Sequence, residues 1–192
     1  MQKENIYNIP NLLSFYRIIA FPFILYLGLN RQENLFAIFL VINLITDVLD
    51  GFIARKFNMQ TEFGARLDSI ADIGTYILAI TGIFIFKAID FKPHLFSFYI
   101  FIFMLFASFA LSLLKFKRLP SLHLYSWKIG GYIQGAFFLI LFTLGFYPVF
   151  YYFMIAWGIL AFAEHIAILL IIKTMISNAK GLYWVLKNKN LS

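Results

Sequence analysis

The stretch from Asp47 to Asp72 reads DVLDGFIARKFNMQTEFGARLDSIAD, and it concentrates acidic side chains in a chain that is otherwise apolar. Four of the five aspartates of the protein lie in it, namely Asp47, Asp50, Asp68 and Asp72. A carboxylate deep in a bilayer costs roughly 2.5–3.5 kcal/mol even on the scale derived from insertion experiments. Four carboxylates in so short a segment therefore require a compensating function.

The composition places the chain in a membrane. Its 192 residues are 62% hydrophobic and 13% charged, with a mean hydropathy of +0.83, which is far more apolar than a soluble domain of this length. The net charge of +7 does not indicate a nucleic-acid partner, because the basic residues fall at the ends of apolar runs, where they anchor helices. Cysteine is absent, which excludes disulfides and thiolate metal sites.

Long apolar runs without strand-like alternation predict an all-α integral membrane protein, since about 20 apolar residues span a bilayer as a helix. Six transmembrane helices are expected, at residues 12–30, 34–54, 68–88, 94–114, 129–146 and 149–172. Lysine and arginine gather in the loops after the second and fourth runs and in the tail. The positive-inside rule then predicts that both termini, and the aspartate cluster, lie on the cytoplasmic side.

The chain shows no linker that would divide it, so residues 1–192 are expected to form a single domain. Residues 1–11 are expected to approach the first helix along the membrane interface. Residues 174–192 are expected to form a cytoplasmic tail, in which Tyr183 and Trp184 anchor the chain at the interface.

Helical spacing gives the first half of the acidic stretch a defined face. Asp47 and Asp50 are three residues apart and share one side of a helix, and Gly51 and Ala54 lie on that same side. The carboxylates would therefore sit beside a surface with almost no side chains, with Arg55 following as a cation able to pair with phosphate. Taken alone, the two small residues are equally typical of helix packing in membranes.

The second half repeats the pattern, because Gly64, Asp68 and Asp72 follow one another at four-residue intervals and form one stripe. Two such stripes on adjacent antiparallel helices would bring four carboxylates to one point. Such carboxylates cannot all stay ionised without cations, and hard oxygen ligands favour Mg²⁺ or Mn²⁺, with room for two ions. The simpler alternative is that the aspartates cap helix ends or pair with neighbouring Arg and Lys residues.

The stretch resembles the signature of the CDP-alcohol phosphotransferase family, D-x2-D-G-x2-A-R-x8-G-x3-D-x3-D. Every fixed position is present, at Asp47, Asp50, Gly51, Ala54, Arg55, Gly64, Asp68 and Asp72. The resemblance implies a six-helix bundle that displaces CMP from a CDP-linked lipid or alcohol, using the hydroxyl of a second substrate. It also implies a membrane location with the active site at the cytoplasmic face, as in a bacterial cytoplasmic membrane, and a homodimer.

Carried over by position, the family roles assign two divalent metals to Asp47, Asp50, Asp68 and Asp72. The CDP site would be formed by Asp47, Gly51, Ala54, Arg55 and Gly64. Asp72 would be the general base for the acceptor hydroxyl, a role that a carboxylate beside a metal can fill.

The opening Ile9–Ser14 with Arg17 is similar to the branch of phosphatidylglycerophosphate synthases and CMP-forming cardiolipin synthases. Trp127 departs from the glycine that this branch carries before Lys128. The resemblance favours transfer of a phosphatidyl group from CDP-diacylglycerol to glycerol 3-phosphate. Phosphatidylglycerol (giving cardiolipin), serine, inositol and inositol phosphate are the alternative acceptors.

Four cations of one cytoplasmic loop could attract a phosphate on the acceptor, and Lys115, Arg118 and Lys128 are the candidates for that contact. An equally good reading is that this loop only obeys the positive-inside rule. Arg17, one or two turns into the first helix, could either snorkel to the interface or face the acidic site.

A divalent-cation transporter is the rival function, because intramembrane carboxylates also mark ion pathways. The aspartates lie near one membrane face rather than at the midplane, and no pair of broken helices recurs in the two halves, which argues against it. Glu164 and His165 lie in the last apolar run, far from the acidic stretch, and are expected to form an interhelical hydrogen bond or a polar contact.

Overall fold

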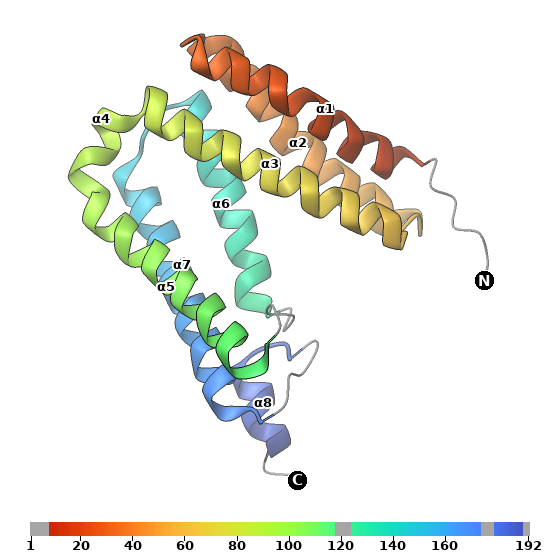
Figure 1. Cartoon of the computed structure of the whole chain (residues 1–192), viewed down its shortest axis with the longest axis vertical. Helices are drawn as coiled ribbons and strands as arrows, with labels where there is room; N and C mark the ends of the chain where they lie inside the picture. The colour runs from red at the N-terminus through yellow and green to blue at the C-terminus, as the bar shows by residue number, and fades with distance from the viewer. Residues whose placement is uncertain (1–7, 118–123, 174–178, 190–192) are drawn as a thin grey trace. The chain divides into compact units, whose positions relative to one another are not determined.

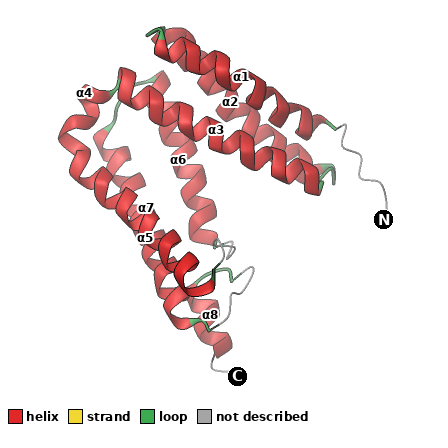
Figure 2. Cartoon of the chain, in the orientation of Figure 1, coloured by secondary structure: helices red, strands yellow, loops and turns green. Residues whose placement is uncertain are grey.

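The computed structural model describes residues 8–117, 124–173 and 179–189, and every element in these residues is helical (Figure 2). The long helices are α1 (Ile9–Leu29), α2 (Glu33–Lys56), α3 (Glu62–Phe86), α5 (Leu95–Phe116), α6 (Tyr125–Thr143) and α7 (Pro148–Ile171). The short ones are α4 (Ala88–Phe91), the 3₁₀ turn η1 (Lys92–His94) and α8 (Leu182–Lys189). The all-α prediction is confirmed, with one long helix for each of the six predicted runs.

Side-chain caps set where two of the helices begin. The Asn8 side chain accepts a hydrogen bond from the backbone N–H of Asn11 at 2.9 Å and starts α1. Thr61 Oγ1 accepts from the N–H of Gly64 at 2.9 Å and starts α3. Such caps satisfy N–H groups that have no partner within the helix. Helix α3 therefore begins before the apolar run that predicted it, because its first two turns are polar.

Two compact units make up the chain. The first contains the described residues up to Phe91 together with Leu139–Gly145, and the second contains the other described residues. In the first unit α1 runs alongside both α2 and α3 (Figure 1). Phe36 is fully buried there, and its ring packs against Phe86 and Phe142 at centroid distances of 5.3 and 5.8 Å. In a membrane, close packing of this kind holds helices together, because lipid supplies no hydrophobic driving force between them.

The second unit is built on α5 and α7, which pack along each other. His165 of α7 and Ser108 of α5 are both fully buried, and they share a hydrogen bond between Nδ1 and Oγ. Glu164 accepts hydrogen bonds from the Ser126 hydroxyl of α6 at 2.5 Å and from the Leu182 N–H of α8 at 2.8 Å. The expected interhelical hydrogen bonds of Glu164 and His165 are confirmed.

Five helices in the described part of the chain are long and apolar enough to cross a membrane. They are Ile9–Leu29, Glu33–Lys56, Glu62–Phe86, Ala88–Phe116 and Pro148–Ile171. They mark a multi-pass membrane protein. Helix α6 is not among them, because Ser126, Lys128 and Gln134 make its first half more polar. A sixth membrane span stays a prediction.

Replacement of Glu164 by alanine should release α8 from α7. The variant removes the acceptor of the Leu182 N–H, which is the first amide of α8. Leaving one such partly buried donor unpaired costs about 1–3 kcal/mol, so amide exchange in α8 should become roughly tenfold faster or more. Hydrogen–deuterium exchange read by mass spectrometry measures this rate.

The matched control is Glu164→Gln, which keeps an acceptor oxygen at the same position and should change exchange in α8 much less. Equal exchange in wild type and Glu164→Ala would show that other contacts hold α8.

Candidate active site

Four carboxylates from two helices meet at one cation from a third. Asp47 and Asp50 project from α2, Asp68 and Asp72 from α3, and Arg17 from α1. The Arg17 guanidinium donates from Nη1 to Asp47 (2.6 Å) and Asp72 (2.9 Å), and from Nη2 to Asp50 (2.6 Å) and Asp68 (2.7 Å). The two acidic stripes expected from the sequence therefore do converge, and each terminal nitrogen of Arg17 joins one carboxylate of α2 to one of α3.

The cluster has a closed inner side and an open outer side. The side chains of Arg17 and Asp50 are 0% and 4% exposed, whereas those of Asp47, Asp68 and Asp72 are each 42–43% exposed. A buried charge is tolerated only when it is paired and hydrogen-bonded. Asp50 Oδ2 accepts hydrogen bonds from Arg17 and from the Ser14 hydroxyl at 3.0 Å, whereas the buried Nε of Arg17 has no hydrogen-bond partner among the described residues.

Arg17 thus faces the acidic site rather than snorkelling to the interface, which decides between the two orientations that the sequence leaves open. Asn11, Ser14 and Arg17 follow at three-residue intervals on α1, and all three are buried. Such a polar stripe in an apolar helix is the signal that could have placed α1 in the site. The acidic stretch by itself could not predict the contribution of α1, because Arg17 lies 30 positions before Asp47 in the sequence.

Hydrogen bonds from Asn8 and Asn11 connect the α2–α3 loop to the beginning of α1, and we call this region the corner. Asn8 Nδ2 donates to the carbonyl of Met59 at 3.2 Å, and Asn11 Nδ2 donates to Thr61 Oγ1 at 3.4 Å. The same Asn8 and Thr61 cap α1 and α3. Because each residue serves both a helix start and a loop contact, the N-termini of α1 and α3 are held next to each other.

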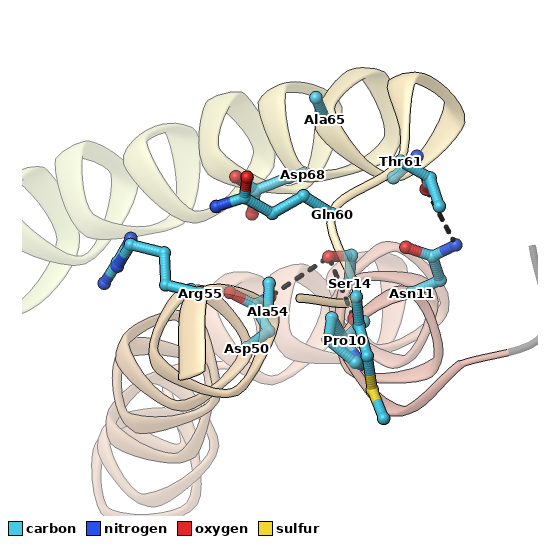
Figure 3. Close-up of a pocket in the computed structure, with 13 residues that line it drawn as sticks. Pro10, Asn11, Ser14, Asp50, Ala54, Arg55, Gln60, Thr61, Ala65 and Asp68 are labelled. Carbon is cyan, nitrogen blue, oxygen red and sulfur yellow. Dashed lines mark hydrogen bonds between the residues drawn. The ribbon is translucent and has the colours of Figure 1, made fainter. Parts of the chain in front are cut away.

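A cavity of about 280 Å³ opens beside this corner (Figure 3). It is lined by Pro10, Asn11, Ser14, Asp50, Gly51, Ala54, Arg55, Met59, Gln60, Thr61, Gly64, Ala65 and Asp68. Four of the residues expected at a CDP site are among them, and Asp47, the fifth, is not. The carboxylate pair on Arg17 Nη2 lines the cavity, and the pair on Nη1 lies outside the lining.

The two motif glycines have different local surroundings. A Cβ on Gly64 would lie 2.2 Å from Asn11 Oδ1 and 2.8 Å from Thr61 Oγ1, so only glycine allows the corner to close. A Cβ on Gly51 would meet only the end of the Arg55 side chain, at 3.2 Å, and that side chain can move away. Gly64 is therefore required for packing, whereas Gly51 adds no side chain to the cavity wall.

The cluster fits divalent cations by charge and by ligand chemistry. Ligand oxygens of Asp47, Asp50 and Asp68 lie within 4.8 Å of one another. One guanidinium can balance only one of four ionised carboxylates, and carboxylate oxygens are the donors that Mg²⁺ and Mn²⁺ prefer.

The basic residues expected to bind an acceptor phosphate lie in the second unit. Lys115 Nζ donates to the carbonyls of Leu169 and Leu170 at 2.7 and 3.1 Å, where it caps the end of α7. Lys128 Nζ lies 5.8 Å from the centre of the Tyr125 ring. Arg118 lies outside the described residues. A role of these three cations at the acceptor stays a prediction.

The site combines paired carboxylates with a cavity lined by small residues, in a protein with several membrane-spanning helices. Comparison with known proteins identifies its family. The CDP-alcohol phosphatidyltransferase family model matches residues 7–176. The chain belongs to this family.

Individual relatives match over shorter segments. A CDP-diacylglycerol–glycerol-3-phosphate 3-phosphatidyltransferase of Salmonella choleraesuis is 44% identical over 69 residues, which are 34% of this chain and 38% of that protein. The protein of the same name in Escherichia coli K12 is 41% identical over 69 residues, again 34% of this chain and 38% of that protein. A CMP-forming cardiolipin synthase/mitochondrial hydrolase fusion protein of Schizosaccharomyces pombe is 41% identical over 70 residues, 36% of this chain and 12% of that protein. The matches therefore span well under half of each relative. No solved structure gives a significant match.

Substitution of Gly64 by alanine should destabilise the corner. The added methyl group would overlap Thr61, which caps α3, and the buried Asn11 side chain, which is hydrogen-bonded to Thr61. Overpacking of this kind costs about 1–3 kcal/mol. The apparent midpoint of thermal unfolding in detergent should fall by several degrees.

The control is Gly51→Ala in the same motif, which should unfold near the wild-type temperature because Arg55 can yield. Equal midpoints for the two variants would contradict the assignment of Gly64 to packing.

Proposed function

We propose that the protein transfers a phosphatidyl group from CDP-diacylglycerol to an alcohol and releases CMP. The observation that carries the proposal is the meeting of all four motif aspartates beside a cavity that also contains the motif glycines, Ala54 and Arg55. Membership of the CDP-alcohol phosphatidyltransferase family supports the same reaction.

The cavity is the proposed site for the cytidine diphosphate part of the donor. The N-termini of α1 and α3 open onto it through Asn11 and Gly64, and helix N-termini carry partial positive charge that favours phosphate groups. Arg55 adds a full positive charge to the lining. Gly51 and Ala54 leave space for the ligand to approach the helix backbone.

Asp50 and Asp68 at the cavity edge, with Asp47 and Asp72 behind them, are proposed to hold two Mg²⁺ or Mn²⁺ ions. When bound, these ions would neutralise the diphosphate and stabilise the charge that develops as CMP leaves.

Asp72 is proposed to take the proton from the acceptor hydroxyl. It belongs to the carboxylate pair outside the cavity lining, and its side chain is 42% exposed, which leaves it accessible to an acceptor hydroxyl. The acceptor oxygen then forms a bond to the phosphorus that carries diacylglycerol. The bond from that phosphorus to the bridging oxygen breaks, and CMP departs with the bridging oxygen.

Glycerol 3-phosphate is the proposed acceptor. Support comes from the bacterial relatives, whose name specifies this acceptor, and from the basic residues Lys115 and Lys128, which could attract its phosphate. Phosphatidylglycerol is the second candidate, favoured by the fission-yeast relative named as a CMP-forming cardiolipin synthase.

The proposed setting is a bacterial-type cytoplasmic membrane, crossed six times by a single domain, with both termini and the acidic cluster on the cytoplasmic side. The distribution of Lys and Arg in the sequence supports this orientation. A homodimer is proposed from the resemblance to the family.

CMP release by the purified protein tests the proposal. With CDP-diacylglycerol and Mn²⁺ or Mg²⁺, release is expected in the presence of glycerol 3-phosphate and not with serine or inositol. Release that needs phosphatidylglycerol instead would move the assignment to cardiolipin synthesis. No release with any acceptor, from folded protein that binds the metal, would contradict the proposed reaction.

Asp72→Asn should lower CMP release by about 10²–10⁴-fold, since the amide cannot accept the acceptor proton. Asp90→Asn is the matched control, because Asp90 is the one aspartate outside the motif and is exposed on α4. It should react at the wild-type rate. Wild-type turnover in Asp72→Asn would overturn the assignment of the base.

A further inference from the structure

Arg17 contacts every carboxylate of the acidic cluster, although it lies outside the family motif. Its guanidinium forms four ion pairs of 2.6–2.9 Å, and each of its two terminal nitrogens bridges α2 to α3. Four carboxylates brought together without a cation would repel one another strongly. In the metal-free protein, Arg17 therefore performs the neutralisation that holds the two helices together at this level.

The position of Arg17 within the cluster is also informative. Its side chain is 0% exposed, as is nearly all of Asp50, while the other three carboxylate side chains are each exposed over about two fifths of their surface. Arg17 contacts one oxygen of each carboxylate, so a cation can approach the other oxygen of the three exposed carboxylates. Arg17 can therefore stay in place when metals bind.

The number of carboxylates allows Arg17 to stay in the cluster together with metal ions instead of competing with them. Four carboxylates outnumber one guanidinium, so the cluster has carboxylates left over whose charge further cations could balance. Displacement of Arg17 would break four ion pairs at once and leave its charge buried without a partner, which is strongly unfavourable.

We propose that Arg17 is a positioning residue, a fixed inner counter-cation that assembles the four carboxylates before any metal binds. The inference rests on the proposed metal binding of the cluster. A preassembled site loses little of the metal-binding free energy to reorganisation. Without Arg17, the metal ions must both bring α2 and α3 together and fill the site, so the metals bind more weakly and stabilise the folded protein less.

The test compares thermal unfolding of purified wild type, Arg17→Gln and Arg66→Gln, each in chelator and in saturating Mn²⁺. Arg66→Gln is the matched control, because it also removes one positive charge. Arg66 forms an ion pair with Glu62 on α3, and both side chains are more than 70% exposed. In chelator, Arg17→Gln should unfold on the order of 10 °C below wild type, and Arg66→Gln close to wild type. Mn²⁺ should raise the midpoint of Arg17→Gln less than that of wild type, because part of its binding free energy is used to bring the four carboxylates together.

Mn²⁺ binding, followed by electron paramagnetic resonance, adds a readout that general destabilisation does not move. A positioning role predicts weaker Mn²⁺ binding in Arg17→Gln than in wild type, because part of the binding free energy assembles the site. Tighter binding with an unchanged midpoint in chelator would identify Arg17 as a competitor and overturn the proposal. Equal Mn²⁺ stabilisation of wild type and Arg17→Gln would overturn it as well.

If Arg17→Gln does not fold, the double variant Arg17→Gln/Asp50→Asn keeps the proposal testable. It removes one positive and one negative charge from the buried side, and should recover much of the midpoint lost in chelator. Failure to recover would contradict a counter-cation role. Absence of any Mn²⁺ effect on wild type would instead count against the proposed metal site, so the two failures are distinguishable.

Discussion

The pairing of one buried guanidinium with four carboxylates determines how the first unit of this protein is arranged. Arg17 of α1 can be buried only because α2 and α3 each supply two aspartates to it, and those aspartates can approach one another only because Arg17 lies between them. The three helices are therefore interdependent at the site. Apolar packing around Phe36 stabilises the same helices farther along, next to an ion pair between Glu33 and Lys87 at 2.7 Å.

The cavity follows from a second constraint, the corner at the N-termini of α1 and α3. Asn8 and Thr61 cap these helices and also hold the α2–α3 loop, while Gly64 allows Asn11 to approach without a steric clash. The result is a space between one edge of the acidic cluster and two helix N-termini. Negative charge on one side and partial positive charge on the other suit a ligand that carries phosphates and shares cations with the carboxylates.

Much of this arrangement could be predicted from the sequence, because helical periodicity alone puts the motif aspartates on single faces of two helices. The long helices were equally predictable, since apolar runs of membrane-spanning length leave few alternatives. The early beginning of α3 could not be read from hydropathy, because a polar first turn is specified by the Thr61 cap rather than by apolar residues. Arg17 was harder still. The polar stripe of Asn11, Ser14 and Arg17 on α1 indicates a buried polar face, but it does not say which helices that face contacts.

The central claim is that the four motif aspartates form one divalent-cation site. A Mn²⁺ titration of the purified protein, read by electron paramagnetic resonance, tests it most directly when wild type is compared with Asp68→Asn. We expect about two bound ions per wild-type chain, from the four carboxylates available, and a clear loss of binding in the variant. No bound Mn²⁺ in folded wild type, or the same stoichiometry and affinity in Asp68→Asn, would contradict the account.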